Sequence, residues 1–314
     1  MLSARQRLLL FSKGLAMGAA DSVPGVSGGT VALITGIYEE LVDSIHNIGW
    51  QALRIWKEQG MRAAWRYING DFLITLVSGI LLSLLVLARL VILLLENFRP
   101  YLMAFFAGLL LASIRFVAMN IRVWRGTEYS LLLAGAAGAG VLAFMPMGEP
   151  GSSLPMYFIY GAIGICAMIL PGISGAFILV LLGAYAPVLS AVAALNLPVM
   201  FTFAAGCVFG LMAFSRLLSW LLHHHHDLIM AFLTGMLGGS LIMLWPWQLP
   251  AEHLFGEHSI IVYEHLLPGA FRAATGQDIS VLACTGLLLV GAALVLLLEY
   301  VAGNLVGKDR SSRA

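Results

Sequence analysis

The sequence contains two related stretches, DSVPGVSGGT at residues 21–30 and MILPGISG at residues 168–175. Each lies inside a longer apolar segment, at 14–45 and 156–195 respectively. Proline ends a helix, glycine permits backbone conformations that other residues avoid, and serine is a common N-cap. Each segment is therefore predicted to form a re-entrant helical hairpin whose tip lies within a membrane.

The composition excludes an ordinary soluble domain. Of the 314 residues, 60% are hydrophobic and 11% are charged, and the mean hydropathy is +0.93. A net charge of +1 offers no basic surface for nucleic acid. Besides the two hairpins, six segments are long and apolar enough to cross the bilayer as helices: 72–95, 100–120, 129–147, 199–222, 228–247 and 279–302. We expect an all-α polytopic membrane protein.

The two hairpins belong to an internal repeat. In one register Pro24–Gly28 aligns with Pro171–Gly175, and the same register places Tyr38 on Tyr185. Gly36 aligns with Gly183 in this first register as well. After one shift, the identities continue through the spans: Thr75, Gly79, Arg89, Met103–Phe105 and Gly108 align with Thr202, Gly206, Arg216, Met230–Phe232 and Gly235. The chain is predicted to be two copies of a hairpin plus three spans, 1–147 and 148–314. Because three crossings invert the second copy, the pattern favours a secondary transporter.

The basic residues predict the orientation, because positive loops stay in the cytoplasm. Twelve of them fall in the segments predicted to be cytoplasmic: Arg5, Arg7, Lys13, Arg54, Lys57, Arg62, Arg66, Arg122, Arg125, Lys308, Arg310 and Arg313. The predicted outer segments contain Arg99 and Arg272. Both termini are expected in the cytoplasm, and the second hairpin is expected to open from the outer face. Residues 49–68, rich in Trp and basic side chains, favour a helix in the membrane interface. The outer loop 248–277 is expected to be irregular or partly helical.

The two tips are the strongest candidate for a binding site. Free backbone amides at helix N-termini attract anions, and two opposed N-termini favour a phosphate. The alternative is that the small residues only allow close helix packing. The inverted duplication favours a site, so the predicted substrate cradle consists of Gly25, Ser27, Gly28, Gly29, Thr30, Gly172, Ser174 and Gly175.

Several charged residues fall within the apolar segments. Arg89 and Arg216 occupy equivalent positions, where an unpaired cation costs about 2.5–3.5 kcal/mol. They either attract the phosphate or extend to the interface, and we include them among the substrate-binding candidates. Asp21 lies near the first tip and is the candidate coupling site for H⁺ or Na⁺, with a counter-ion for an arginine as the alternative. Glu39, farther along the hairpin, is a weaker coupling candidate.

Other reactive side chains give weaker signals. Cys166, Cys207 and Cys284 lack metal-ligand spacing and are expected to be small core residues. The run His223–His226 suits a metal or pH-sensing cluster, although a solvated loop is favoured. The Glu–His pairs between residues 252 and 265 match no helix-face metal motif. We expect no catalytic residue, bound metal or cofactor.

The long motifs at Lys13–Thr30, Gly36–Glu39 and Ala167–Gly175 resemble the bacterial polyprenyl-phosphate transporter family of the PopT type. The resemblance covers nearly the whole chain. It implies movement of undecaprenyl phosphate, the lipid carrier for peptidoglycan, from the outer to the inner leaflet of the bacterial cytoplasmic membrane. The implied partners are this lipid and the bilayer, and a homo-oligomer is compatible with the sequence. From the residues alone, a transporter of small anions and a lipid-pyrophosphate phosphatase remain alternatives, although a phosphatase needs a nucleophile and a general acid.

Overall fold

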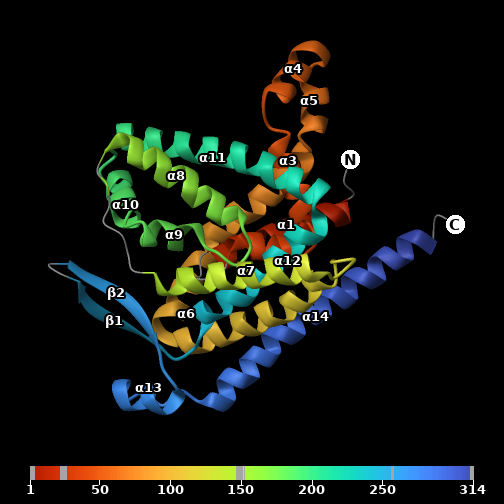
Figure 1. Cartoon of the computed structure of the whole chain (residues 1–314). Coiled ribbons are helices and arrows are strands. Elements are labelled where there is room, and N and C mark those ends of the chain that lie inside the picture. Colours follow the sequence, from red (N-terminus) through yellow and green to blue (C-terminus); the bar gives the residue numbers. More distant parts are fainter. Residues whose placement is uncertain (1–3, 22–26, 146–150, 152, 256–257, 312–314) are drawn as a thin grey trace.

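The chain forms a bundle of helices with a two-stranded sheet at one end (Figure 1). The computed structural model describes residues 4–21, 27–145, 151, 153–255 and 258–311. The N-terminal half contains α1 (Ala4–Asp21), α2 (Gly28–Ile34), α3 (Tyr38–His46), α4 (Trp50–Gln59), α5 (Met61–Tyr67), α6 (Gly70–Ala118) and α7 (Gly126–Phe144). The C-terminal half contains α8 (Leu154–Ile169), α9 (Gly175–Leu181), α10 (Tyr185–Ala193), α11 (Leu197–His224), α12 (His226–Ser240), the 3₁₀ turn η1 (Leu241–Leu244), β1 (Gln248–Phe255), β2 (His258–His265), α13 (Pro268–Thr275) and α14 (Val281–Ser311).

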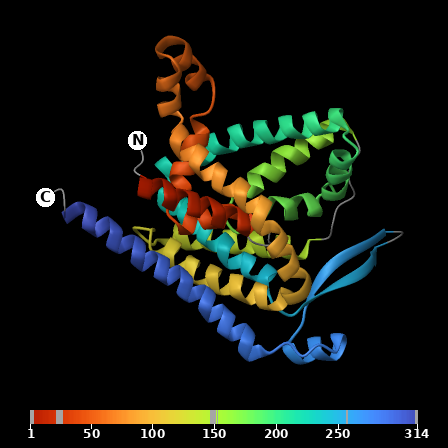
Figure 2. The ribbon, with the colours of Figure 1, turned by 180° about the vertical axis from the view of Figure 1, so that it is seen from behind.

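Each of the six apolar segments predicted to cross the membrane is largely helical over its described residues. Within the described ranges, four helical stretches are long and apolar enough to span on their own, or up to six if each bent helix pair is one span. The four are Asn97–Ala118, Gly126–Phe144, Leu197–His224 and His226–Leu244. The first two predicted spans are the arms of α6, which doubles back at Phe98 (Figures 1 and 2). Phe98 has non-helical angles, φ −134° and ψ 29°, and Pro100 follows two residues later, where it removes a backbone donor.

The two hairpins are built alike, which follows from the sequence they share. Each has an entry helix, a break, a seven-residue helix (α2 or α9) and a nine-residue helix (α3 or α10). The turns between the short helices use Gly36 at φ +70° and Gly183 at φ +67°, a conformation that glycine adopts without strain. In the second hairpin the two short helices are bent by 108° to one another. The hairpins enter from opposite ends of the bundle (Figures 1 and 2).

Four helix pairs make the most extensive helix–helix contacts: α1 with α6, α8 with α11, α6 with α14, and α7 with α12. In every pair, glycines face the backbone of the partner helix so closely that a β-carbon would collide with a carbonyl oxygen. These glycines are Gly14 and Gly79, Gly161 and Gly206, Gly108 and Gly291, and Gly135 and Gly235. Small residues of this kind let membrane helices approach without bulky side chains between them.

The same glycines follow the register of the sequence repeat. Gly79 aligns with Gly206 and Gly108 with Gly235, so the contact of α1 with α6 corresponds to that of α8 with α11. The contact of α6 with α14 likewise corresponds to that of α12 with α7. The second span of each half therefore packs against the third span of the other half, which interlocks the halves.

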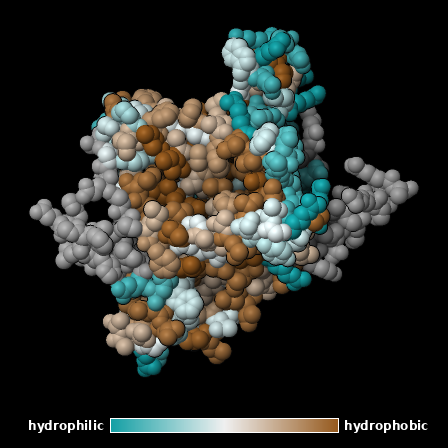
Figure 3. All heavy atoms as spheres, in the orientation of Figure 1, coloured by the Kyte–Doolittle hydropathy of each residue, from teal (hydrophilic) through white to brown (hydrophobic). Residues whose placement is uncertain are grey.

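Polar and apolar segments are distributed as a membrane requires. Apolar side chains cover the visible middle of the bundle, whereas hydrophilic ones gather on α4 and α5 and on the neighbouring end (Figure 3). That end also carries the start of α1 and the end of α14, while the sheet and α13 lie at the opposite end (Figure 1). Little of α11 is covered by other helices, as expected for a helix that faces lipid.

Two local expectations need correction. The helix predicted over 49–68 is two helices, α4 and α5, because Gly60 adopts φ +87° between them. The loop predicted to be irregular or partly helical contains α13 but also an antiparallel hairpin in which Gln248 pairs with His265. The segment from 258 to 265, HSIIVYEH, is rich in β-branched residues and Tyr, which favour strands.

Candidate functional site

The two interrupted stretches meet inside the bundle, as the sequence predicts. The Ser27 hydroxyl donates a hydrogen bond of 3.0 Å to the Met168 carbonyl oxygen. The Gly172 amide donates one of 2.8 Å to Thr30 Oγ1. A β-carbon at Gly29 would lie 2.5 Å from the Ile169 carbonyl oxygen, so the backbones touch at this point. Residues about 140 positions apart in the chain thus form one crossing, to which both halves contribute.

The first tip satisfies its own amides. Asp21 Oδ1 accepts a hydrogen bond of 2.6 Å from the Gly28 amide. Ser27 is the N-cap of α2, and its hydroxyl accepts from the Gly29 amide at 3.1 Å. The Thr30 amide donates to the Ser27 carbonyl oxygen at 2.9 Å. The expectation of free amides at this tip is therefore wrong for the conformation described: a carboxylate of the chain already occupies the anion position. The predicted site residue Gly25 lies outside the described residues.

The second tip is built differently. Gly172 has φ +86°, a conformation that favours glycine, and a β-carbon there would lie in tight contact, 3.1 Å from the Met236 carbonyl oxygen. Ser174 precedes α9, but its hydroxyl makes no capping bond to the first turn of that helix. Gly175 lies against the Gly164 carbonyl oxygen of α8. The two tips therefore have similar sequences but different hydrogen bonds.

The crossing is closed to water in this conformation. The exposed fractions of Ser27, Thr30 and Ser174 are 0%, 1% and 6%. Asp21, at the edge of the crossing, is only partly buried. A ligand that reaches the tips must therefore approach past Asp21 or follow a movement of the helices.

Of the two candidate arginines, only Arg216 has a described side chain. Arg216 is exposed near the end of α11 and lies against Gly49, which precedes α4. Among the described residues it forms no hydrogen bond or ion pair. The side chain of Arg89 lies outside the described part of the structure. The described contacts do not bring the Arg216 guanidinium to the crossing.

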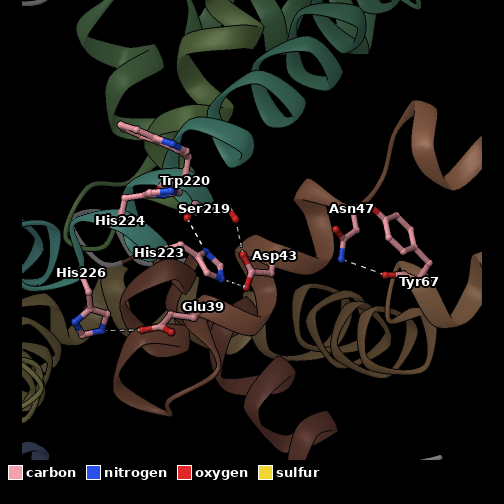
Figure 4. A network of polar contacts seen from close by, with 9 residues as sticks. All are labelled: Glu39, Asp43, Asn47, Tyr67, Ser219, Trp220, His223, His224 and His226. Carbon is pink, nitrogen blue, oxygen red and sulfur yellow. Dashed lines mark hydrogen bonds and ion pairs between the residues drawn. The ribbon is translucent and has the colours of Figure 1, made fainter.

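Glu39, the weaker coupling candidate, belongs to a separate polar network (Figure 4). Its Oε1 lies 3.1 Å from His226 Nε2 at the start of α12. Asp43, one turn later on α3, accepts a hydrogen bond of 2.6 Å from the Ser219 hydroxyl and lies 3.7 Å from His223 Nε2. The network joins the return arm of the first hairpin to the junction of α11 and α12 (Figure 4).

This network corrects the expectation of an idle histidine loop. His223 lies in the last turn of α11, His226 begins α12, and both contact carboxylates of α3. Sequence reasoning also missed Asp43 and Ser219. The available signal was spacing, since Glu39 and Asp43, like Ser219 and His223, are four residues apart and share one helix face. No cluster of three or more His, Cys, Asp or Glu side chains in the described ranges could hold a metal ion.

Comparison with known proteins places this architecture in a family. Residues 17–262 match the family described as VCA0040-like, undecaprenyl phosphate translocase-like. The chain is similar to a polyprenyl-phosphate transporter of Vibrio cholerae serotype O1, with 44% identity over 94% of this chain and 97% of the relative. It is also similar to a polyprenyl-phosphate transporter of Staphylococcus aureus, with 32% identity over 80% of this chain and 90% of the relative. No solved structure matches the chain. With a family match across both hairpins and two relatives aligned over most of their length, the chain belongs to the polyprenyl-phosphate transporter family.

Proposed function

We propose that this protein carries undecaprenyl phosphate across the bacterial cytoplasmic membrane, from the outer to the inner leaflet. The family match names this lipid, and both relatives are named as transporters of polyprenyl phosphate rather than as enzymes. The observation that carries the proposal is the meeting of the two tips. Transport of a charged head group needs a polar crossing point in the interior, to which both halves contribute.

The proposed architecture is a pair of inverted repeats, 1–147 and 148–314. Three observations support it: the shared build of the hairpins, their entry from opposite ends, and the glycine contacts that follow the repeat register. In transporters of this kind, access alternates as one repeat moves against the other around a fixed site.

The proposed head-group site lies at the crossing and uses Ser27, Gly28, Gly29 and Thr30 from one half with Gly172, Ser174 and Gly175 from the other. Three further residues stay candidates for binding the head group because of their positions in the sequence repeat: Gly25, Arg89 and Arg216. The support is chemical: the Asp21 carboxylate marks a position where the Gly28 amide already holds an anion at 2.6 Å. A lipid phosphate that displaced this carboxylate would accept the same bond.

Asp21 is the proposed coupling residue. While it is ionised, its carboxylate competes with the phosphate for the Gly28 amide and repels it. Protonation removes the charge and weakens this competition. Binding of a proton and binding of the phosphate would then favour one another, as ion-coupled transport requires. Glu39 stays a secondary candidate on account of its contact with His226.

The proposed orientation places both termini in the cytoplasm. The basic residues of α1, α4 and α5 then face the cytoplasmic leaflet, as the positive-inside rule requires. The sheet and α13 face outward. In this orientation α4 and α5 lie in the membrane interface, with Trp50 and Trp56 exposed.

Reconstitution with doubly labelled lipid tests the function. Undecaprenyl phosphate carrying one label on the phosphate and another on the prenyl chain is placed in one leaflet of protein-containing vesicles. Its appearance in the other leaflet is then followed. The proposal predicts that both labels move together and faster than in protein-free vesicles. Release of inorganic phosphate would indicate a phosphatase, and no movement would contradict the proposal.

A further inference from the structure

An apolar cavity lies beside the crossing, between the two halves of the chain. Its volume is about 230 Å³. The first half contributes α1, α2 and the second arm of α6, and the second half contributes η1 and α14. Its walls include Ala16, Ala19, Thr30, Phe105, Leu244 and Val295. Because Thr30 also accepts the hydrogen bond from Gly172, the cavity begins where the two tips meet.

The walls favour an apolar occupant. Two hydroxyl groups line the cavity, and both are engaged: Thr30 Oγ1 with the Gly172 amide, and Thr35 Oγ1 with the Val31 carbonyl oxygen at 2.8 Å. The other lining residues are Ala, Val, Ile, Leu and Phe. A polar ligand would find few partners for its hydrogen bonds here, so it would pay the cost of desolvation.

A cation contacts one of the cavity residues, Thr35. Lys13 lies one turn before Ala16 on α1, and its Nζ donates a hydrogen bond of 2.7 Å to the carbonyl oxygen of Thr35. The Lys13 side chain is partly buried, and it interacts electrostatically with the negative charge of Glu40. Within the described ranges no carboxylate lies at ion-pairing distance from Lys13 Nζ, and Glu40 instead accepts a hydrogen bond from Asn69. An ammonium group has three donors, so Lys13 retains capacity for an anion.

We propose that this cavity binds the isoprenoid units next to the phosphate of a prenyl phosphate, with the phosphate at the Lys13 end. The inference rests on the proposed function and adds to it a lateral site for the chain and a second position for the head group. An anionic head on an apolar chain matches the pairing of one ammonium with an apolar cavity. A phosphate leaving the crossing would meet Lys13 on the side of the bundle where α1 begins.

Binding in this cavity would position the isoprenoid chain rather than stabilise it by the hydrophobic effect. Both the lipid and the cavity are apolar, so moving the chain from one to the other mainly changes its van der Waals packing. A cavity walled by both halves holds the start of the chain close to the crossing while the rest stays in the bilayer. Filling the cavity should therefore impair handling of the chain without removing the polar crossing.

The test uses the full-length protein in vesicles and three aromatic substitutions. Ala16→Phe and Ala19→Phe fill the cavity from α1. Ala137→Phe adds the same side chain at an exposed position of α7 that is not among the cavity walls, and serves as the control. We expect the two filling variants to lose about fivefold or more in transport of undecaprenyl phosphate, which corresponds to roughly 1 kcal/mol, while the control stays near the native rate. Native rates in properly folded filling variants would overturn the inference.

The charge at Lys13 is tested separately. Lys13→Gln keeps a donor for the Thr35 carbonyl oxygen but removes the charge, whereas Lys13→Arg keeps the charge. We expect weaker binding of farnesyl phosphate to the Gln variant and at least partial recovery in the Arg variant. Equal affinity of the native and Gln proteins would overturn the placement of the phosphate.

Photo-crosslinking identifies the occupant. A prenyl phosphate with a diazirine on its first isoprenoid unit should label cavity-lining peptides, and unlabelled undecaprenyl phosphate should suppress this labelling. A diazirine phospholipid that labels the same peptides and is not displaced would show a phospholipid site and overturn the inference. If the native protein moves no prenyl phosphate, the proposed function itself fails. Active native protein with unaffected filling variants defeats this inference alone.

Discussion

The backbone amide of Gly172 donates a hydrogen bond of 2.8 Å to the hydroxyl of Thr30, joining the tips of two hairpins that enter the bundle from opposite ends. Both groups are buried, and Thr30 exposes 1% of its surface. This bond ties the halves of the chain at the place where the head group is proposed to bind. Its removal should therefore affect stability and transport together.

Thr30→Val keeps the shape of the side chain but leaves the Gly172 amide buried without its acceptor. We expect a loss of ~1–3 kcal/mol in the free energy of unfolding, because an unpaired buried donor retains its desolvation cost. Thermal unfolding in detergent measures this change. Thr30→Ser retains the hydroxyl and is the control, and a Val variant as stable as the native protein would contradict the role of the bond.

The two tip serines should differ. Ser27 caps α2 and also donates to the Met168 carbonyl oxygen, whereas the Ser174 hydroxyl forms no capping bond to α9. Ser27→Ala is expected to cost ~1 kcal/mol or more in stability, and Ser174→Ala less. The same unfolding assay compares them. Equal losses would show that the described asymmetry of the tips has no energetic consequence.

Asp21→Asn tests the coupling proposal. The amide oxygen of asparagine can still accept the hydrogen bond from the Gly28 amide. The asparagine side chain is neutral, however, and can neither bind and release a proton nor attract a sodium ion by its charge. We expect transport to persist and to lose its dependence on an imposed proton or sodium gradient. Uptake is measured with and without each gradient. Glu58→Gln on the exposed face of α4 is the control and should behave as the native protein. A gradient-dependent Asp21→Asn protein would exclude Asp21 as the coupling group.

The contact between Glu39 and His226 should contribute modestly to the free energy of unfolding. Their side chains are 56% and 27% exposed, so solvent screening keeps their coupling energy below ~1 kcal/mol. Glu39→Gln and His226→Ala, alone and combined, give a double-mutant cycle for stability. A coupling energy of zero in this cycle would contradict any contribution of the contact to stability.

The glycine contacts between the halves can be tested with a matched pair. Gly108→Ala would place a β-carbon against the Leu288 carbonyl oxygen of α14, whereas nothing lies within 4 Å of such an atom at Gly138. The first substitution is expected to destabilise by ~1–3 kcal/mol through overpacking. Gly138→Ala should be neutral or slightly stabilising, since alanine is the better helix former. Equal effects would mean that α6 and α14 are less closely packed than described.

The sequence predicts the apolar helical segments and the hairpin breaks because these depend on local chemistry. Among the described residues, four helical stretches are long enough to span alone, and up to six spans result if each bent pair counts as one. Long apolar runs and Pro-Gly interruptions act through nearby backbone, so they can be read without knowing the fold. The repeat register also placed Gly79 and Gly206, and Gly108 and Gly235, in equivalent helix contacts.

Other features depend on contacts that no local pattern reveals. Glu39 and His226 are 187 residues apart, and Ser219 and Asp43 are 176 apart. The bond between Asp21 and the Gly28 amide depends on how the chain turns across the break. The sequence indicates a helix N-terminus at the first tip whose amides could bind an external anion. In the structure, the Asp21 carboxylate binds there instead. The exposed arginine Arg216 lies beside Gly49 because α3 packs on α11, a contact that the repeat does not predict.

The most direct test of the central claim is to locate the phosphate. Cryo-electron microscopy of the protein in lipid nanodiscs with undecaprenyl phosphate should show the phosphate density at the crossing, in contact with backbone of both tips and with the Asp21 side chain displaced from the Gly28 amide. Density confined to one half, or at the end of the bundle that carries the sheet, with Asp21 still bound to Gly28, would contradict the account.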